Sequence, residues 1–222
     1  MRVAHACDLP AVGAFKAETE FPILLTERYD RVLSASGGTI AGHPAYTRLH
    51  QEDFSQARGI LATDKYEEGG RHHYLAAMAD LLRRFSSNAI EDIRRLFEMQ
   101  VFNYLIGNCD AHSKNFSVLR DESWETLRLA PFYDLVSTAV YPELSRTMGM
   151  YIEEVSKIDK ISRDNFAELS RELKISAKLA EVCVDEICEK VSEVLRGPDF
   201  QSEVEEKIAD DTRKRIEHIS KR

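Results

Sequence analysis

The sequence contains no long hydrophobic run. No apolar stretch approaches the roughly 20 residues that a transmembrane helix needs. The opening residues, MRVAHACDLP, also lack the apolar segment of a signal peptide. We therefore expect a cytoplasmic protein that does not insert into a membrane.

Cysteine is scarce and follows no metal-binding pattern. The four cysteines are Cys7, Cys109, Cys183 and Cys188. None belongs to a CxxC pair, and Cys183 and Cys188 stand five residues apart with no histidine at ligand spacing. This arrangement argues against a zinc site and predicts reduced thiols that act as small buried hydrophobic groups.

Positive charge is also in short supply. The 30 lysines and arginines are outnumbered by 38 aspartates and glutamates, which gives a net charge of -8 at pH 7. A broad nucleic-acid surface is therefore not expected, and any contact with DNA should be made through a partner. A hydrophobic fraction of 43% over 222 residues is sufficient for one globular domain with its own core.

The first quarter of the chain shows strand and loop signals. Residues 21–28, FPILLTER, form a short apolar run that ends in charged residues and predicts a buried strand. Residues 34–46, SASGGTIAGHPAY, are glycine-rich and typical of a loop. The glycines do not follow the GxGxxG spacing and no helix follows at once, so turn formation is a better interpretation than phosphate binding.

Two helices are predicted in the middle of the chain. The first starts at about residue 72 and has an apolar face formed by Leu75, Met78, Ala79, Leu82 and Phe85. In the second helix, Asn88 is expected to cap the start, Glu91 to complete a capping box, and Gly107 to end it. Its apolar stripe is formed by Ile90, Ile93, Leu96, Phe97, Val101, Tyr104 and Leu105. The second helix should be a buried rod that holds the following loop in a fixed place.

A β-hairpin should follow this loop. Phe116 and Val118 alternate with polar residues, and Leu127 and Leu129 do the same on the other side of the turn RDESWE.

From about residue 164 the sequence is almost wholly helical. The apolar face of this region is formed by Ile175, Leu179, Val182, Cys183, Ile187, Val191 and Val194. The residues GPD at 197–199 should separate it from a final charged helix, EVEEKIADDTRKRIEHISKR. We interpret the final helix as a solvated helix whose charged side chains form salt bridges along its faces, with partner binding as a second possibility.

The segment GNCDAHSKNFSVL, residues 107–119, places several polar groups directly after the predicted buried helix. Asp110 and Asn115 lie in this loop, and Asp134 follows the hairpin. This order should bring the three side chains to one mouth of the fold. A single Asp or Asn in a loop is more often a turn or cap residue. The joint pattern nevertheless favours a functional site.

The chemistry that fits this set is phosphoryl transfer. It needs a carboxylate that accepts the proton of the attacking hydroxyl, and oxygen ligands for Mg²⁺. The spacing Asp-x-x-x-x-Asn from Asp110 to Asn115 is that of a kinase catalytic loop, and Asp134 has the place of the kinase metal-binding aspartate. His112 and Lys114 could contact phosphate oxygens or the leaving group as it gains charge.

The sequence resembles the HipA family of bacterial serine/threonine kinases, the toxin halves of type II toxin-antitoxin pairs. The resemblance rests on LLTERYDR (24–31), RLHQEDFSQARG (48–59), KYEEGG (65–70), FNYLIGNCDAHSKNFSVL (102–119) and LAPFYDLVSTAVYP (129–142). It implies a mainly α fold with small β elements, namely a protein-kinase-like C-terminal lobe with a helical bundle and a β-hairpin at the active site. Residues 1–222 would form one such domain, composed of a hinge segment (1–31), a catalytic core (32–160) and C-terminal helices (161–222).

The resemblance also implies roles for individual residues. Asp110 resembles the catalytic base, Asn115 and Asp134 resemble the Mg²⁺ ligands, and His112 and Lys114 resemble nucleotide or phosphate contacts.

A second group resembles the hinge that holds the adenine of ATP through backbone groups. It comprises Glu27, Arg28, Tyr29 and Asp30, with Asp30 placed to reach the ribose. Gln51 and Asp53 resemble a supporting motif near the site, for which structural anchoring is the better interpretation.

Partners follow from the resemblance alone. It implies a protein substrate, such as an aminoacyl-tRNA synthetase, and a role in bacterial persistence. It also implies an antitoxin partner of the HipB type, through which the chain would contact DNA only indirectly.

The sequence departs from the family pattern at its start. The opening MRVAHACDLPAVGAF is similar to the helix and turn just before the hinge strand. We therefore expect the N-terminal lobe, with its phosphate-covering loop and phosphate-pairing lysine, to be absent from this chain. Lys16 lies eleven residues before Glu27 and is interpreted as a surface residue. The chain alone should be a weak or inactive kinase that a separate N-lobe chain could complete.

Two alternative functions stay open. The chain could be a non-catalytic kinase lobe that binds an antitoxin or a complementary subunit. It could also be a metallophosphoesterase, in which His, Asn and Asp side chains hold two metal ions. That site needs further histidines at the ends of other strands, and the remaining histidines stand in no comparable setting.

Overall fold

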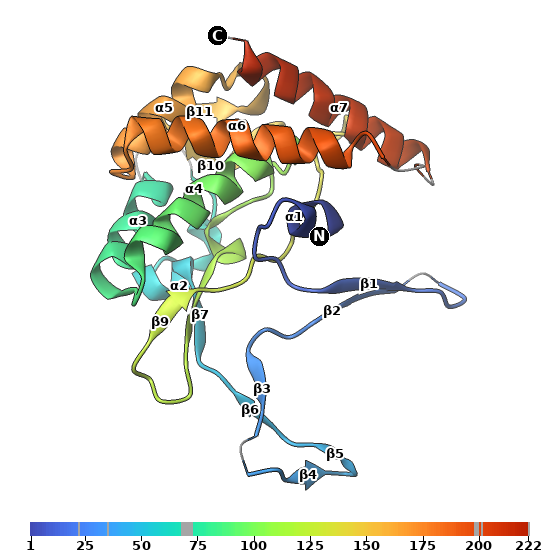
Figure 1. The fold of residues 1–222 in the computed structure, drawn as a ribbon, viewed down its shortest axis with the longest axis vertical. Coiled ribbons are helices and arrows are strands. Elements are labelled where there is room, and N and C mark those ends of the chain that lie inside the picture. Colours follow the sequence, from blue (N-terminus) through green and yellow to red (C-terminus); the bar gives the residue numbers. More distant parts are fainter. Residues whose placement is uncertain (22, 35, 68–72, 198–199, 201, 222) are drawn as a thin grey trace.

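The computed structural model describes residues 1–21, 23–34, 36–67, 73–197, 200 and 202–221. The helices are stacked in one half of the molecule, and narrow β ribbons project from it (Figure 1). The predicted mainly α fold with small β elements is therefore confirmed.

The helices differ widely in length. They are α1 (Arg2–Ala6), α2 (Phe54–Arg58), α3 (Tyr74–Phe85), α4 (Ala89–Ile106), α5 (Arg163–Glu172), α6 (Ala177–Val194) and α7 (Glu203–Ser220). The longest are α4, α6 and α7, with 18 residues each. Short 3-10 turns occur at Ala62–Asp64, Ser113–Asn115 and Ile158–Lys160. No helix of the described residues combines the length and the apolar character needed to cross a bilayer.

The strands are short and all paired strands run antiparallel. They are β1 (Ala14–Ala17), β2 (Ile23–Thr26), β3 (Arg31–Leu33), β4 (Thr39–Ile40), β5 (His43–Pro44), β6 (Tyr46–Arg48), β7 (Gln51–Asp53), β8 (Ser117–Arg120), β9 (Leu127–Leu129), β10 (Thr147–Ile152) and β11 (Val155–Lys157). β7, β8 and β9 form a three-stranded sheet, and the other strands pair as β1 with β2, β3 with β6, β4 with β5, and β10 with β11.

Helix α4 is the centre of the core. It packs against α3, α6 and α7, and most of the predicted apolar stripe is fully buried. The exception is Ile90, which is 82% exposed because it lies in the first turn on the outer face. Gly107 ends the helix as predicted, with a left-handed φ of 75° that favours glycine.

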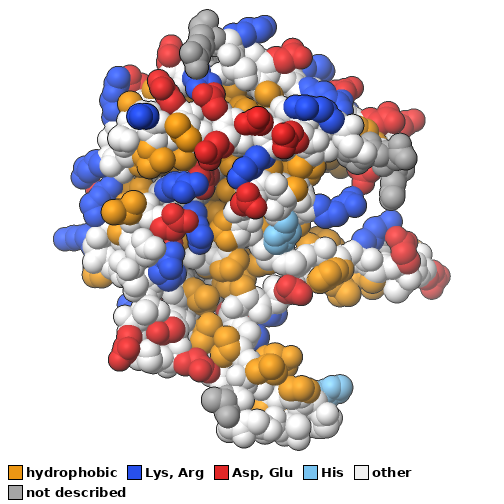
Figure 2. Space-filling view, viewed as in Figure 1, with side chains coloured by type: hydrophobic (Ala, Val, Ile, Leu, Met, Phe, Trp, Pro, Cys, Tyr) orange, Lys and Arg blue, Asp and Glu red, His pale blue; other side chains and the backbone are white. Residues whose placement is uncertain are grey.

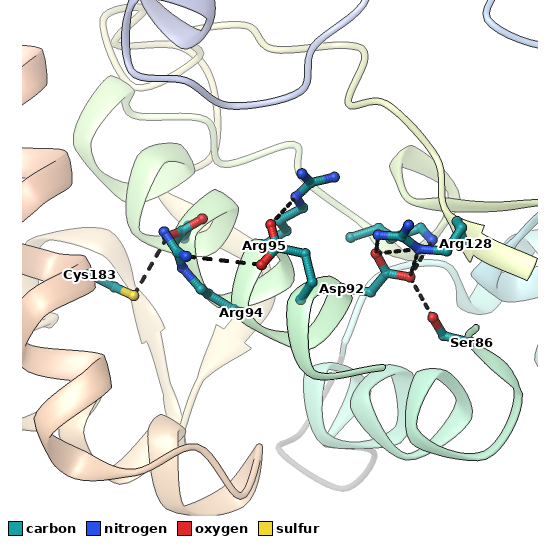
Figure 3. A network of polar contacts seen from close by, with 9 residues as sticks. Ser86, Asp92, Arg94, Arg95, Arg128 and Cys183 are labelled. Carbon is teal, nitrogen blue, oxygen red and sulfur yellow. Dashed lines mark hydrogen bonds and ion pairs between the residues drawn. The ribbon is translucent and has the colours of Figure 1, made fainter. Parts of the chain in front are cut away.

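The predicted capping of α4 is wrong. Asn88 occupies the N-cap position but its side chain makes no capping hydrogen bond. Glu91 instead accepts a hydrogen bond from Arg95 Nε at 2.8 Å, one turn later on the helix. The start of α4 is fixed by Asp92, which is fully buried and binds Ser86, Arg128 and the backbone of β9 (Figure 3).

The first strands differ from the prediction in their burial. β2 forms where the sequence predicted a strand, but every residue in it is exposed, because the β1-β2 hairpin projects from the body and no described layer covers it (Figure 1). The predicted loop at 34–46 contains the short strands β4 and β5 and the start of β6. Ala41 and Gly42 both have positive φ, which is the geometry of a tight hairpin turn.

The hairpin after residue 115 is confirmed. Val118 pairs with Leu129 across β8 and β9, and both side chains are buried. β7 adds to the other edge of β8, so that Asp53 pairs with Ser117. This sheet places residues from widely separated parts of the chain beside the loop that follows α4.

The C-terminal helices bury one face, but not every predicted member of it. Cys183, Ile187 and Val191 are buried, whereas Val182 is 42% exposed and Ile175, Leu179 and Val194 are half-buried. Helix α3 shows a similar deviation, because Phe85 in its last turn is 60% exposed.

The last helix, α7, is not simply solvated as predicted. It packs against α4 and α6, and Ala209, Thr212 and Ile219 are buried. Arg215 donates from Nε to the carbonyl oxygen of Tyr104 at 3.2 Å, and burial lowers the pKa of its guanidinium. An Arg on a predicted surface helix thus satisfies a backbone carbonyl at the end of α4.

The prediction for the cysteines is confirmed. All four are free and buried. Burial raises the pKa of Cys7 to about 11 and those of Cys183 and Cys188 to about 12, so these thiols stay protonated and unreactive at neutral pH.

Candidate active site

The loop after α4 is fixed at its first residue. The carbonyl oxygen of Gly107 accepts hydrogen bonds from the backbone amides of Thr138 and Ala139, each at 3.0 Å. A Cβ at position 107 would lie 2.9 Å from Ala139 Cβ, so glycine is required for space as well as for φ. The segment that follows Asp134 is thereby attached to the end of α4.

Asn108 connects the two segments that carry the predicted acids. Its Nδ2 donates to the carbonyl oxygen of Asp134 at 3.2 Å, and its Oδ1 accepts from the backbone N–H of Asp110 at 3.2 Å. The side chain is 1% exposed. Sequence reasoning assigned no role to Asn108, although a polar residue directly after a buried helix is a usable signal.

The structure brings Asn115 and Asp134 together. Asn115 Nδ2 donates to Asp134 Oδ2 at 2.6 Å, while Asn115 Oδ1 accepts from the backbone N–H of His112 at 3.1 Å. Asp134 has a φ of 57°, an uncommon conformation for a residue other than glycine, and its side chain is exposed. Strained backbone of this kind is concentrated at functional sites.

The oxygen donors of this pair fit a hard divalent cation such as Mg²⁺. Mg²⁺ is usually held by one or two protein oxygen ligands, and substrate phosphates and water complete the shell. Asp134 offers a solvent-exposed carboxylate. The Asn115 amide faces it with its nitrogen, while its oxygen accepts from the backbone N–H of His112, so the amide would have to turn over to offer an oxygen ligand beside Asp134. The described residues contain no cluster of three or more His, Cys, Asp or Glu side chains that could hold a metal ion. They thus give no support to the two-metal phosphoesterase alternative.

Asp110 lies on the same loop and is partly exposed. Its Oδ1 accepts a hydrogen bond from the hydroxyl of Tyr66 at 2.6 Å. A cavity of about 520 Å³ opens beside it, with Tyr66, Thr138, Met148 and Tyr151 among its walls. A hydroxyl group that enters this cavity could reach the carboxylate.

His112 and Lys114 stand between Asp110 and Asn115, but both are engaged within the protein. Lys114 Nζ forms an ion pair with Asp53 at 3.0 Å. The His112 ring is 7% exposed and meets the edge of the Tyr66 ring at 5.1 Å. Burial, together with the nearby Lys65, lowers the pKa of His112, so the imidazole is neutral at pH 7.

Asp53 and Gln51 have the anchoring role that the sequence predicted. Asp53 caps α2 by accepting from the backbone N–H of Gln56 at 2.8 Å, and it also holds Lys114. Gln51 accepts a hydrogen bond from the hydroxyl of Tyr29.

The predicted hinge residues lie between β2 and β3. The backbone N–H of Glu27 donates to the carbonyl oxygen of Gly13 at 2.9 Å, which fastens the end of β2 to the residue before β1. The ring of Tyr29 stacks on that of Tyr133 at 5.9 Å, directly beside Asp134. The hinge and the Asp134 segment are therefore in contact.

Asp30 is held away from the solvent. It is 1% exposed and accepts two hydrogen bonds from Arg28, at 2.7 and 2.8 Å, and one from Arg31 at 2.5 Å. The hydrogen bonds from Arg28 are the main reason that the pKa of Asp30 falls to about 2. In this arrangement the carboxylate orders the hinge, and its contact with a ribose stays a prediction.

A cleft of about 920 Å³ lies between the β1-β2 hairpin, the residues around Asp134 and the start of α7. Its lining includes Phe15, Leu24, Tyr133, Asp134 and Leu135. The lining also contains the acidic Glu18 and Glu205 and the basic Arg2 and Lys16, so the cleft combines apolar walls with charged groups and has the size of a nucleotide-sized ligand site.

Lys16 is on the rim of this cleft. Its ammonium pairs with Glu18 at 3.0 Å and the side chain is 65% exposed, which confirms the prediction that it is a surface residue.

Gly149 is a further residue that sequence reasoning missed. A Cβ at this position of β10 would lie 2.8 Å from the carbonyl oxygen of Ala111, so the strand can approach the loop only through glycine. A glycine inside the apolar run TMGMYI was the available signal, because such a glycine often marks a close backbone approach.

Comparisons with known proteins identify the family of the chain. A family model described as HipA-like C-terminal domain matches residues 1–195. Y4mE of Sinorhizobium fredii, a candidate kinase, is 36% identical over 178 residues, which cover 78% of this chain and 40% of the relative. HipA of Shewanella oneidensis, a serine/threonine-protein kinase toxin, is 30% identical over 167 residues, which cover 69% of this chain and 34% of the relative.

Solved structures show the same fold. HipA in the Shewanella oneidensis complex of HipA, HipB and operator DNA superposes with a TM-score of 0.79 at 23% identity, over 99% of this chain and 54% of that chain. The Helicobacter pylori proinflammatory kinase CtkA superposes with a TM-score of 0.58 at 14% identity, over 98% of this chain and 80% of that one. The chain thus spans about half of the HipA chain and has a kinase-like C-terminal fold.

Proposed function

Because the chain belongs to the family of HipA-like C-terminal domains, we propose that it is the catalytic lobe of a protein serine/threonine kinase. In this proposal it transfers the terminal phosphoryl group of ATP, with Mg²⁺, to a serine or threonine of a protein. The observation that carries the proposal is the polar chain in which Asn108 links Asp110 to Asp134 while Asn115 binds the Asp134 carboxylate. In this proposal the two segments act as the catalytic loop and the metal-binding loop.

In this proposal Asp110 is the base that accepts the proton of the acceptor hydroxyl. Asn115 and Asp134 would hold Mg²⁺, which neutralises charge on the phosphates when it is bound. Lys114 and His112 would contact phosphate oxygens. Lys114 could do so after release from Asp53, since its side chain is 35% exposed.

ATP would occupy the cleft between the β1-β2 hairpin and the Asp134 segment. The hinge residues Glu27 to Asp30 would hold the adenine through backbone groups, with Tyr29 fixed against Tyr133. Asp134 lines this cleft, which supports the placement, because the phosphates of ATP must reach the same cation as the Asp134 carboxylate.

We also propose that a complementary N-lobe covers the β1-β2 hairpin. Phe15 is 56% exposed, Leu24 71% and Leu25 53%, and Figure 2 shows hydrophobic side chains along the projecting hairpin. Large apolar side chains gathered on a projecting two-stranded ribbon are typical of a surface that a partner covers. The N-lobe could belong to a longer form of the chain or to a separate chain.

Further partners come from the relatives. The HipA of Shewanella oneidensis was solved in complex with HipB and operator DNA, and we propose an antitoxin of this type as a partner that makes the DNA contacts. A cytoplasmic protein substrate, with an aminoacyl-tRNA synthetase as one candidate, follows from the family and stays a prediction.

A phosphotransfer assay tests the proposed function. The chain is incubated with radiolabelled ATP, Mg²⁺ and a cytoplasmic protein extract, alone and together with an N-lobe polypeptide of a HipA-like kinase. We expect little transfer by the chain alone and clear transfer by the pair, because loss of one clamp on developing phosphate charge commonly costs about 10²- to 10³-fold in rate. Equally strong transfer by the lone chain would refute the need for an N-lobe, and no transfer in either mixture would contradict the kinase proposal.

A further inference from the structure

Residues 65–67 form a short segment beside the loop that carries Asp110 and Ser113. The proposed function has given this segment no role so far. The carbonyl oxygen of Lys65 accepts from the backbone N–H of Ser113 at 3.2 Å and from its hydroxyl at 3.0 Å. On the other side, the backbone N–H of Glu67 donates to Gly149 at 2.9 Å. The segment is thus attached to the catalytic loop at one end and to β10 at the other.

Glu67 strengthens the attachment to β10. It is 4% exposed, and its Oε2 accepts from the backbone N–H of Tyr151 at 2.9 Å. β10 in turn touches the catalytic loop at Gly149, where the missing Cβ allows contact with Ala111. The three pieces therefore form one rigid unit around Tyr66.

Within this unit the side chain of Tyr66 lies over the loop. Its hydroxyl donates to Asp110 Oδ1 at 2.6 Å, its ring meets the ring of His112 edge to face, and Lys65 Nζ lies 4.7 Å from its ring centroid. Burial, with a contribution from the bond to Asp110, raises the pKa of Tyr66 to about 12. The phenol therefore stays protonated at working pH and remains a donor.

We infer that Tyr66 is a positioning residue for Asp110, an inference that rests on the proposed kinase function. A carboxylate turns freely about its Cβ–Cγ bond unless one oxygen is held. The hydrogen bond from Tyr66 holds Oδ1, while Oδ2 accepts no hydrogen bond from any described residue and is left for the acceptor hydroxyl. A hydrogen bond between a neutral donor and a carboxylate is among the stronger ones in proteins.

The opposite role, in which the hydroxyl of Tyr66 occupies the acceptor position and must swing away, is not favoured. Rotation of the Tyr66 side chain away from Asp110 would give up the edge-to-face contact with His112 and the contact with Lys65 Nζ together with the hydrogen bond. The cavity beside Asp110 also gives the acceptor its own approach.

The substitution Tyr66→Phe tests this inference because it removes only the hydroxyl. In the phosphotransfer assay with the N-lobe polypeptide present, we expect kcat to fall about tenfold, as for other residues that orient a reacting group, while KM for ATP stays unchanged. Tyr46→Phe is the matched control, since Tyr46 is 55% exposed on β6, away from the loop, and should leave kcat unaltered. An unchanged kcat in Tyr66→Phe, or a higher kcat/KM for the protein acceptor, would overturn the inference.

A second measurement needs no enzymatic activity. Free energies of unfolding in urea are compared for Tyr66→Phe, Asp110→Ala and the double variant, because alanine, unlike asparagine, cannot accept from the Tyr66 hydroxyl. If the two side chains are bonded as the structure shows, the double variant should lose less than the sum of the single losses. Additive losses would overturn the inference. Failure of the kinase proposal is distinct, because wild type and Asp110→Asn would then transfer equally little phosphate, and the role of Tyr66 would fall with it.

Discussion

Replacing Asp110 by asparagine should lower kcat for phosphotransfer by about 10²- to 10⁴-fold, the usual contribution of a general base. The amide has nearly the same shape, and it can still accept from Tyr66 through its oxygen, so the loop should remain in place. It cannot take the proton of the acceptor hydroxyl. KM for ATP should change little, because Asp134 lines the proposed nucleotide cleft and Asp110 does not.

The assay for this prediction is initial-rate phosphotransfer at saturating ATP with the N-lobe polypeptide present. Asp121→Asn is the control, since this substitution makes the same chemical change in the turn between β8 and β9. A variant at position 110 that keeps more than a tenth of the wild-type rate would show that Asp110 is not the base.

The non-catalytic alternative makes a different prediction, namely that Asp110→Asn leaves antitoxin binding and biological effect unaltered.

The largest effect on stability is expected from Asp92→Ala. Asp92 is fully buried, accepts from Arg128 Nη2 at 2.8 Å and from Ser86 Oγ at 2.6 Å, and also accepts from the backbone N–H of Leu129 at 2.9 Å (Figure 3). One carboxylate thus joins the end of α3, the start of α4 and strand β9. Removal of one partner from a buried ion pair typically costs about 3 to 5 kcal/mol.

The lower part of this range is the better expectation, because the Arg128 side chain is 38% exposed and can regain water when its partner is lost. Urea unfolding followed by circular dichroism gives the free energy of unfolding. Arg95→Ala is the control: it breaks the partly exposed pair with Glu91 on the same helix, for which about 0.3 to 0.5 kcal/mol is expected. Equal losses in the two variants would show that the Asp92 network is not a structural anchor.

The helices could be predicted from sequence because their signal is local. Leu75, Met78 and Leu82 repeat at helical spacing and are buried, and Gly107 ends α4 as its position suggested. The cap at Asn88 failed for a tertiary reason, since the neighbouring Asp92 is fixed by Arg128 from 36 residues away.

Burial of the first strands could not be predicted in the same way. The run at β2 is apolar, but burial depends on a covering layer, and no described segment covers it. An apolar strand that is covered by a partner protein and an apolar strand inside a core have the same sequence pattern. The error at β2 is therefore informative, because it marks the surface proposed to bind the N-lobe.

The polar residues of the site were predicted from their spacing and their order around the hairpin, and the structure brings Asn115 and Asp134 into contact. Their supports could not be predicted, because they depend on tertiary contacts. The bond between Asn108 and Asp134 joins residues 26 positions apart, and that between Tyr66 and Asp110 joins residues 44 positions apart. Only the fold reveals such pairings.

The most direct test of the proposed site is titration of the isotope-labelled chain with Mn²⁺, which replaces Mg²⁺ at oxygen sites and broadens nearby NMR signals. We predict that the backbone signals of Asn115 and Asp134 broaden together at the lowest Mn²⁺ concentrations, that excess Mg²⁺ restores them, and that Asp134→Asn abolishes the effect while Asp110→Asn preserves it. Broadening that starts elsewhere, or that persists in Asp134→Asn, would contradict a cation site formed by these two residues.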